Sequence, residues 1–337
     1  MAVVTGTNWN AYDAATMTAR EIYGRTLAEL GKHNDKIVGL TADLAKTTAI
    51  VHFEKAFPER FFNVGIAEQN MFGIAAGLAK AGLIPFASTM AVFTCLRAGE
   101  QVRTDIAYQN LPVKIIATHA GISFGHAGTT HHCTEDLAIM RSIANMTVIC
   151  PADGIETSKA VQACVDTPGP VYIRIGRGFE PPCYESDNYT YEIGKAITMR
   201  EGTDLTIICC GIAVLQAVNA AKTLAETDGI SVRVINMHTI KPIDREAILK
   251  AVTETRRILT VEEHNVIGGL GDAVGSVIAE SGKGCVFKKH GIQDTFAAIG
   301  YAEDLYAHYG LDANGIVDKV REMLGMEFEA DENWDDE

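Results

Sequence analysis

One carboxylate, Glu68, stands in a run of apolar and small residues that extends from Phe62 to Phe93. The apolar spacing in this run predicts a buried helix over about Ile66 to Ala81. Burying a carboxylate is costly unless a partner compensates its charge, so Glu68 is a candidate for binding or proton chemistry. The alternative is an ordinary first-turn acid that the helix dipole favours.

Two glycines, Gly73 and Gly77, lie four residues apart in the same segment. At that spacing they share one side of a helix and leave it without side chains, so another helix can approach closely. The segment therefore predicts a tight helix interface with an acid held near its start.

A second group of chemically active side chains lies in the segment Ala120–Cys133, AGISFGHAGTTHHC. Three glycines and three histidines without an apolar period indicate a binding loop. The histidines His126, His131 and His132 raise the question of a metal site. Because no further ligands follow at a suitable spacing, we predict no metal site in this chain.

The elements that must position these residues alternate between strand and helix. Buried strands are predicted at Ile37–Leu44, Leu83–Ala87, Val113–His119 and Gly169–Gly178, and helices at Thr16–His33, Phe93–Tyr108, Glu135–Asn145 and Ile155–Asp166. Asp43 and His119 are polar residues near two of the strand ends, where open α/β sheets place groups that meet ligands. This part is therefore predicted to be α/β with a largely parallel sheet.

A second α/β domain is predicted after a stretch rich in proline and polar residues. Its expected strands are Asp204–Gly211, Val232–Met237, Arg257–His264 and Thr295–Gly300, and its expected helices are Ile212–Glu226, Arg245–Thr253, Asp272–Glu280 and Asn314–Leu324. The expected organisation is an N-terminal arm (1–15), a first domain (16–180), a linker (181–200), a second domain (201–325) and an acidic disordered tail (326–337).

Composition narrows the class of protein. The chain has 337 residues, 47% of them hydrophobic, which suits two domains with ample cores. With no apolar run of membrane-spanning length and no signal-peptide pattern, we expect a cytoplasmic protein with no membrane partner. The eight cysteines show no paired zinc spacing. The net charge of −14 argues against a nucleic-acid partner.

Two motifs carry a resemblance to a known family. The segment GIAEQ, an apolar helix, AAGLA and a P-F-x-S-T turn resembles the pyrimidine-binding domain of the transketolase family of thiamine diphosphate enzymes. Further on, VEEHN-x-x-G-G-L-G resembles the C-terminal domain of the same family, and the resemblance spans roughly residues 16–325. It implies an α/β fold with a thiamine-pyrimidine-binding-type parallel-sheet domain followed by a transketolase C-terminal-type α/β domain.

The resemblance also implies a partner chain. The family holds the diphosphate and Mg²⁺ with a G-D-G motif followed by an asparagine, and the sequence contains no G-D-G. We therefore expect one subunit of a split transketolase. Its partner would be an N-terminal transketolase subunit with the diphosphate-binding domain, which would hold the metal and the diphosphate, in an α2β2 assembly.

Cofactor contacts follow from the resemblance residue by residue. Glu68 would hydrogen-bond a nitrogen of the aminopyrimidine ring and control its protonation. Phe93 matches one of two aromatic positions that stack on this ring, and the other falls at Met90, whose thioether could still pack on a ring face. Asp43 matches an aspartate near the cofactor and the subunit contact. A core aromatic and a strand-end turn residue remain the alternatives for Phe93 and Asp43.

Substrate contacts are implied in the same way. Arg20 and Arg174 match arginines that bind the substrate phosphate, for which guanidinium forks are suited; the alternative for both is a surface ion pair. His119 and His131 match histidines that contact the substrate hydroxyls and carbonyl and can pass protons during catalysis.

One substrate position departs from the family pattern. Ala127 stands where transketolases carry an aspartate that contacts a sugar hydroxyl, and His126 precedes it. Either His126 replaces that contact or the substrate is not a standard pentose-pathway sugar.

The resemblance therefore predicts the C-terminal subunit of a two-chain, thiamine diphosphate-dependent transketolase. Such an enzyme moves a two-carbon ketol unit from a ketose phosphate to an aldose acceptor. Three alternatives stay open: a deoxyxylulose-phosphate synthase-like activity, a 2-oxoacid dehydrogenase β-type subunit, and a catalytically silent regulatory subunit.

Overall fold

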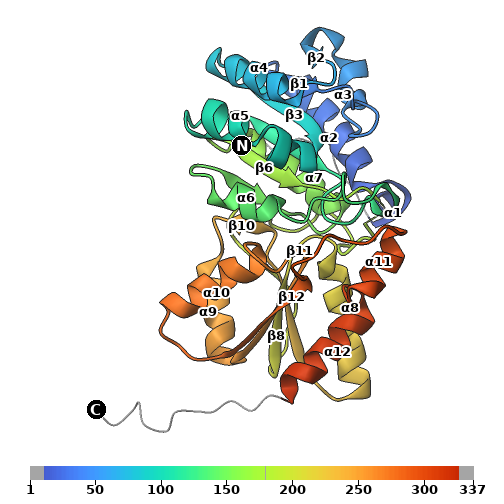
Figure 1. The fold of residues 1–337 in the computed structure, drawn as a ribbon, viewed down its shortest axis with the longest axis vertical. Coiled ribbons are helices and arrows are strands. Elements are labelled where there is room, and N and C mark those ends of the chain that lie inside the picture. Colours follow the sequence, from blue (N-terminus) through green and yellow to red (C-terminus); the bar gives the residue numbers. More distant parts are fainter. Residues whose placement is uncertain (1–10, 179, 326–337) are drawn as a thin grey trace.

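The computed structural model describes residues 11–178 and 180–325. They form two α/β parts that follow each other along the long axis of the molecule, each with helices on both faces of a central sheet (Figure 1). The predicted acidic tail and residues 1–10 of the predicted arm lie outside the described residues. Helix α1 (Ala11–Thr16) contains the last five residues of the predicted arm, 11–15, and the first residue of the predicted first domain.

The first sheet has the strand order β10-β5-β6-β4-β3-β1-β2 within the described chain. Its strands are β1 (Ile37–Thr41), β2 (Phe61–Asn63), β3 (Ile84–Met90), β4 (Lys114–Thr118), β5 (Thr147–Ile149), β6 (Val171–Arg174) and β10 (Thr239–Lys241). Neighbours are parallel except for β10 and β5. The predicted α/β fold with a largely parallel sheet is confirmed.

Two helical layers cover this sheet. One consists of α2 (Ala19–His33), α3 (Val51–Ala56) and α7 (Gly154–Val165), which bury apolar side chains on one face. The other face carries α4 (Glu68–Lys80), α5 (Gly99–Gln101) and α6 (Asp136–Ser142), with the π-helical turns η2 (Phe93–Arg97) and η3 (Val102–Ala107) on either side of α5. The short 3₁₀ turns are η1 (Pro58–Arg60) and η4 (Gly125–Ala127).

Helix α4 begins at Glu68, later than the predicted start, and Ile66 before it is 81% exposed. The helix buries one side and exposes the other. A Cβ atom on Gly77 would meet nothing within 4 Å among the described residues, and one on Gly73 would meet only Asp105, at 3.8 Å. The glycine stripe is therefore not filled by the described part of this chain.

The second sheet has the order β12-β11-β8-β9-β7 within the described chain, and only β7 runs antiparallel to its neighbour. Its strands are β7 (Ile197–Arg200), β8 (Leu205–Cys209), β9 (Val232–Asn236), β11 (Arg257–Asn265) and β12 (Val286–Ile292). The helices are α8 (Ala213–Thr227), α9 (Arg245–Glu254), α10 (Leu270–Glu280), α11 (Ala302–His308) and α12 (Ala313–Leu324). In Figure 1, α9 and α10 lie on one side of this sheet and α8 and α12 on the other.

Several assignments in this half differ from the prediction, and β10 and α11 were not predicted. The predicted strand Thr295–Gly300 is wrong. The edge strand of this sheet is β12, and the two lysines in its sequence, VFKKHGI, interrupt the apolar pattern expected of a strand. Residues 295–300 instead form an irregular segment with exposed Phe296 and Ile299. The Ile299 side chain lies 3.0 Å from where a Cβ on Gly128 would stand, in the loop Ala120–Cys133, which we call the histidine loop. Strand β7 also occupies the last four residues of the range expected to be a linker.

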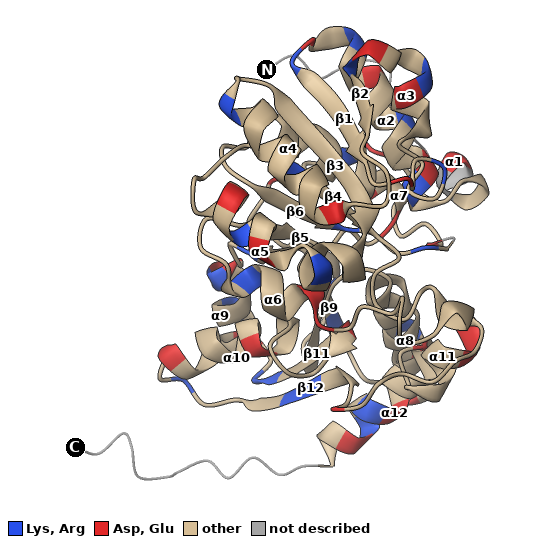
Figure 2. Ribbon diagram, turned by 45° about the horizontal axis from the view of Figure 1, so that its top comes forward, with Lys and Arg blue, Asp and Glu red and all other residues tan. Residues whose placement is uncertain are grey.

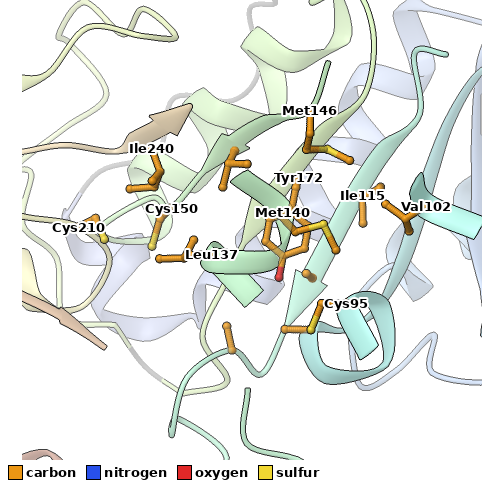
Figure 3. Close-up of a cluster of buried hydrophobic side chains, with 14 of the residues drawn as sticks. Cys95, Val102, Ile115, Leu137, Met140, Met146, Cys150, Tyr172, Cys210 and Ile240 are labelled. Atoms are coloured by element: carbon orange, nitrogen blue, oxygen red, sulfur yellow. The ribbon is translucent and has the colours of Figure 1, made fainter. Parts of the chain in front are cut away.

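The two parts share a sheet edge and a core. Strand β10 belongs by sequence to the second half but pairs with β5 of the first sheet. The largest apolar cluster continues across this junction, and Figure 3 shows Cys210 and Ile240 beside Cys150. The two halves are therefore packed as one body along this junction.

Charged residues of both signs are distributed over the helices of both halves, while the strands of the first sheet are mostly uncharged (Figure 2). Among the described residues, no helix combines the length and the apolar character needed to cross a membrane.

Candidate active site

The candidate residues follow the carboxyl ends of neighbouring parallel strands. Asp43 follows β1, Glu68 follows β2, Phe93 follows β3, His119 follows β4 and Arg177 follows β6. The strand order reverses direction between β1 and β3, and open α/β sheets bind ligands outside the strand ends at such a switch point. The topology therefore gathers these side chains along one edge of the first sheet.

Glu68 is the first residue of α4 and its side chain is only 2% exposed. Glu68 stands in the first turn of the helix, where no side chain caps the start and where the helix dipole favours a negative charge. Arg97 donates to Glu68 Oε1 from Nη1 at 3.0 Å. The buried carboxylate thus has one charged partner, and that partner is 48% exposed.

Phe93 and Arg97 are the first and last residues of the π-helical turn η2. The Arg97 guanidinium lies 4.2 Å from the centroid of the Phe93 ring while it bonds Glu68. One flat group that carries N–H donors therefore meets the aromatic face and the carboxylate at once. An aminopyrimidine ring is also flat and nitrogen-rich, so Glu68 and Phe93 fit the group that the sequence predicted for them.

A row of aromatic rings leads away from Phe93. The ring centroid of His131 lies 5.6 Å from that of Phe93 and 5.4 Å from that of Phe124. Phe124 in turn lies 4.7 Å from His119 and 5.5 Å from His126. The structure thus brings together around Phe124 the three histidines predicted to contact the substrate, His119, His126 and His131. Sequence reasoning missed Phe124, although it is the single aromatic residue of the glycine- and histidine-rich loop.

His119 is buried and has a positive φ of 58°. Its Nδ1 lies 2.8 Å from the hydroxyl of Thr118, which fixes the plane of the ring. Burial, followed by the positive charges of Arg20 and Arg177, lowers the pKa of His119 to about 3. His119 is therefore a neutral imidazole at physiological pH, able to donate or accept a hydrogen bond but not to serve as a standing cation.

Two arginines stand at the far end of the ring row. Arg20, near the start of α2, donates from Nε to the carbonyl oxygen of Arg177 at 2.9 Å and from Nη1 to the carbonyl oxygen of Thr47. The Arg177 guanidinium lies 4.9 Å from the centroid of the Phe124 ring. These contacts place two cations beside His119, where an anionic substrate end would be attracted.

The predicted role of Arg174 in substrate binding is contradicted by its position. Its guanidinium is buried, with Nε 2.9 Å from Asp136 Oδ2 and Nη2 2.8 Å from the Glu263 carbonyl oxygen. The interactions found for this guanidinium among the described residues are with groups at the junction of the two halves. The arginine that faces the ring row is Arg177, three residues later, because β6 ends at Arg174 and the chain then turns toward the strand-end edge.

Glu263 of the VEEHN motif completes this junction. Its Oε1 accepts from the backbone N–H of Ile122 at 2.9 Å and from the Tyr306 hydroxyl at 3.1 Å. The neighbouring Glu262 accepts from the N–H groups of Leu270 and Gly271 at the start of α10. Both glutamates of the motif therefore have structural roles. Glu263 bonds the start of the histidine loop to the second sheet, and Glu262 bonds the start of α10.

A cavity of about 390 Å³ adjoins Phe124 and is lined by both halves of the chain. His126, Arg177 and Glu180 line it from the first half, and Tyr301 and Tyr306 from the second. Burial raises the pKa of Glu180 to about 7. The cavity offers aromatic faces with acidic, basic and imidazole groups, a combination suited to a hydroxylated, charged ligand.

The remaining predicted residues take less prominent places. Asp43 is exposed and bonds Asn63, whose amide lies 3.3 Å from Asp43 Oδ1, so it fastens the turn that precedes Glu68. Met90 lies in the apolar core at 5% exposure, which leaves it little surface for a cofactor. No group of three or more histidine, cysteine or acidic side chains that could hold a metal occurs among the described residues.

Comparison with known proteins agrees with this architecture. Residues 15–180 match the transketolase pyrimidine-binding domain, and residues 194–316 match the transketolase C-terminal domain. The chain therefore belongs to the transketolase family. Within that family it is the C-terminal chain of a two-chain transketolase, as the following relatives show.

The chain is 46% identical over 309 residues to a putative transketolase C-terminal section of Methanocaldococcus jannaschii. The aligned residues cover 91% of this chain and 96% of that protein. It is 41% identical over 308 residues to one of the subunits of the apulose-4-phosphate transketolase of Phocaeicola vulgatus, with 91% and 98% covered. A solved split-gene transketolase, an inactive beta4 tetramer, superposes with a TM-score of 0.85 at 46% identity, covering 91% of this chain and 98% of that one.

Proposed function

We propose that this chain provides the pyrimidine side of the active site in a two-chain transketolase that transfers a two-carbon ketol unit from a ketose phosphate to an aldose. The observation that carries the proposal is a continuous row of groups. It starts at the buried carboxylate of Glu68, passes Phe93 and His131, and ends at His119 and Arg177.

The family depends on thiamine diphosphate, which when bound supplies the electron sink for breaking and making the carbon–carbon bond. In this chain Glu68 would accept a hydrogen bond from the aminopyrimidine ring and hold the proton there. Phe93 would give the ring an aromatic face. Asp43 would support the turn before Glu68, and Met90 would support the site from within the apolar core.

The diphosphate and Mg²⁺ would be held by a partner chain with the diphosphate-binding domain, because the sequence lacks the G-D-G motif. The exposed side of α4, with open space beside Gly77, suits a second chain. By analogy with the inactive beta4 tetramer, the isolated chain would associate with itself and be inactive, and the working enzyme would be an α2β2 complex. We place that complex in the cytoplasm, where sugar phosphates are used.

The chain's own residues would bind and orient the substrate. Neutral His119 and the partly exposed His131 would hydrogen-bond substrate hydroxyl and carbonyl oxygens and pass protons between them. Arg20 and Arg177 would bind the phosphate. Arg177 replaces Arg174 in this role, because Arg174 is enclosed at the junction.

The substrate would be a sugar phosphate outside the standard pentose series. Ala127 has no carboxylate to bond a hydroxyl, and the exposed His126 beside it faces the 390 Å³ cavity. A relative with 41% identity belongs to an apulose-4-phosphate transketolase, which agrees with a non-standard ketose for this chain.

The test is reconstitution. The chain would be co-purified with its partner, and the complex assayed for thiamine diphosphate-dependent ketol transfer from a panel of ketose phosphates that includes apulose-4-phosphate. We expect transfer by the complex and none by the chain alone. A complex that binds thiamine diphosphate but transfers no ketol unit from any member of the panel would contradict the proposal.

A further inference from the structure

Arg97 contacts both residues to which the proposed function assigns the aminopyrimidine ring, Glu68 and Phe93. Its Nη1 lies 3.0 Å from Glu68 Oε1, and its guanidinium carbon lies 4.2 Å from the centroid of the Phe93 ring. A planar, N–H-bearing cation thus sits where a planar, N–H-bearing ring is expected. The guanidinium and the cofactor ring cannot both lie on the same face of Phe93.

There is a physical reason for this contact in a chain without cofactor. The Glu68 side chain is 2% exposed, and a buried carboxylate without a partner is strongly destabilising. Arginine suits this position because its guanidinium stays charged, lies flat on an aromatic ring and donates to a carboxylate. Arg97 therefore neutralises Glu68 and covers Phe93 at the same time.

The Arg97 side chain has access to solvent. It is 48% exposed, and Arg97 is the last residue of the π-helical turn η2. The interactions found for its guanidinium among the described residues are those with Glu68 and Phe93. A ring that replaced both would leave the guanidinium free to turn into solvent or toward a partner chain.

We propose that Arg97 is the resident ligand of the aminopyrimidine subsite in the unassembled chain, and that the cofactor ring displaces it. The inference rests on the proposed role of Glu68 and Phe93. Arg97 then stabilises the chain before assembly and competes with cofactor binding. A site whose competent form is only partly populated binds its ligand more weakly by that fraction.

The test uses the full-length chain and its two-chain complex. Arg97→Met removes the cation with little change in length, and Arg97→Lys keeps a charge for Glu68 but loses the flat group over Phe93. Arg103→Met, an exposed arginine on the same helical segment, is the matched control. Affinity for thiamine diphosphate with Mg²⁺ is measured calorimetrically on each complex, without turnover, and thermal unfolding is measured on each chain alone.

We expect Arg97→Met to bind thiamine diphosphate about tenfold more tightly than the natural sequence if Arg97 fills the subsite about nine-tenths of the time. The affinity of the Arg97→Lys complex for thiamine diphosphate should lie between those of the natural and Arg97→Met complexes. The Arg103→Met complex should bind thiamine diphosphate as the natural complex does. The lone Arg97→Met chain should unfold at a lower temperature, and the added substitution Glu68→Gln should reverse that loss because a neutral amide needs no counter-charge.

Unchanged or weaker cofactor binding by both Arg97 variants would overturn the inference, since it would mean that Arg97 stays bonded to Glu68 in the loaded enzyme or never blocks the site. The proposed function would fail differently: Glu68→Gln alone would then bind the cofactor and turn over normally. The two failures are therefore distinguishable within one set of variants.

Discussion

The guanidinium of Arg174 and the carboxylate of Asp136 form a buried ion pair, with Nε 2.9 Å from Oδ2. Asp136 also accepts from the Tyr172 hydroxyl at 2.7 Å, and the opposite side of Arg174 reaches the Glu263 backbone of the second half at 2.8 Å. The pair therefore connects α6 and β6 of the first half to β11 of the second.

Arg174→Met should destabilise the chain strongly, because it removes the cation from two buried carboxylates, that of Asp136 and that of Glu263, whose Oε2 lies 3.6 Å from Arg174 Nη1. Loss of one partner from a buried pair costs about 3–5 kcal/mol. Urea unfolding of the chain measures this free energy. Arg245→Met is the control, because its pair with Glu280 is exposed and should contribute about 0–1 kcal/mol. Equal losses in the two variants would contradict the assignment of Arg174 to the junction.

Glu68→Gln should abolish ketol transfer by the two-chain complex while the fold is retained. The amide cannot hold the proton that the carboxylate holds, so we expect a loss of about 10³-fold or more, in the range of removing a general acid–base group. Turnover and circular dichroism are measured on the same preparation. Glu100→Gln, at an exposed position on α5, should behave as the natural sequence does, and full activity in Glu68→Gln would rule out the proposed role.

Arg177→Met should raise KM for a phosphorylated ketose far more than for the same sugar without phosphate. Hydrogen bonds to charged groups contribute about 1.5–3 kcal/mol, which corresponds to about a 10- to 100-fold loss in kcat/KM. Kinetics with the paired substrates measure the difference. If the loss is the same for both sugars, Arg177 does not bind the phosphate.

The stability of the chain should depend on pH through Glu180. Burial raises the pKa of its carboxyl from 4.5 to about 7 in the folded chain. Between these pH values the folded state holds a proton that the unfolded state has lost, so the stabilisation from Glu180 is fully present below about pH 4.5 and is lost as the pH rises through 7. The difference between the two pKa values of Glu180, 4.5 and about 7, corresponds to a loss of folding free energy on the order of 3 kcal/mol.

Glu180→Gln should therefore lose less stability than the natural sequence when urea unfolding is compared at pH 5 and pH 8. The control is Glu246→Gln, because the Glu246 side chain is exposed. If the curves for the natural chain and Glu180→Gln run parallel with pH, the carboxyl of Glu180 titrates normally and the cavity is wetter than its burial indicates.

The sequence allowed prediction of the parts of the site that depend on local pattern. Polar residues at the ends of buried strands singled out Asp43 and His119, and the isolated acid in an apolar run singled out Glu68. These signals are local because hydrophobic periodicity and strand-end polarity are properties of short segments.

Other features depend on where the chain turns in space. Arg174 and Arg177 are three residues apart in one motif, and only the end of β6 decides which of them faces the site. The π-helical turn that sets Arg97 over Phe93 adds no apolar period of its own. Strand β12 escaped notice because an edge strand tolerates lysines on its exposed side.

Strand β10 has a consequence for any attempt to divide the chain. It begins at Thr239, well past the stretch that connects the two halves, yet it closes the first sheet against β5. A fragment that stopped at residue 200 would keep the Glu68 helix and the histidine loop but would expose the backbone of β5 as an open, sticky edge. Dividing the gene at the apparent boundary between the two halves would therefore separate the first sheet from the strand that completes it.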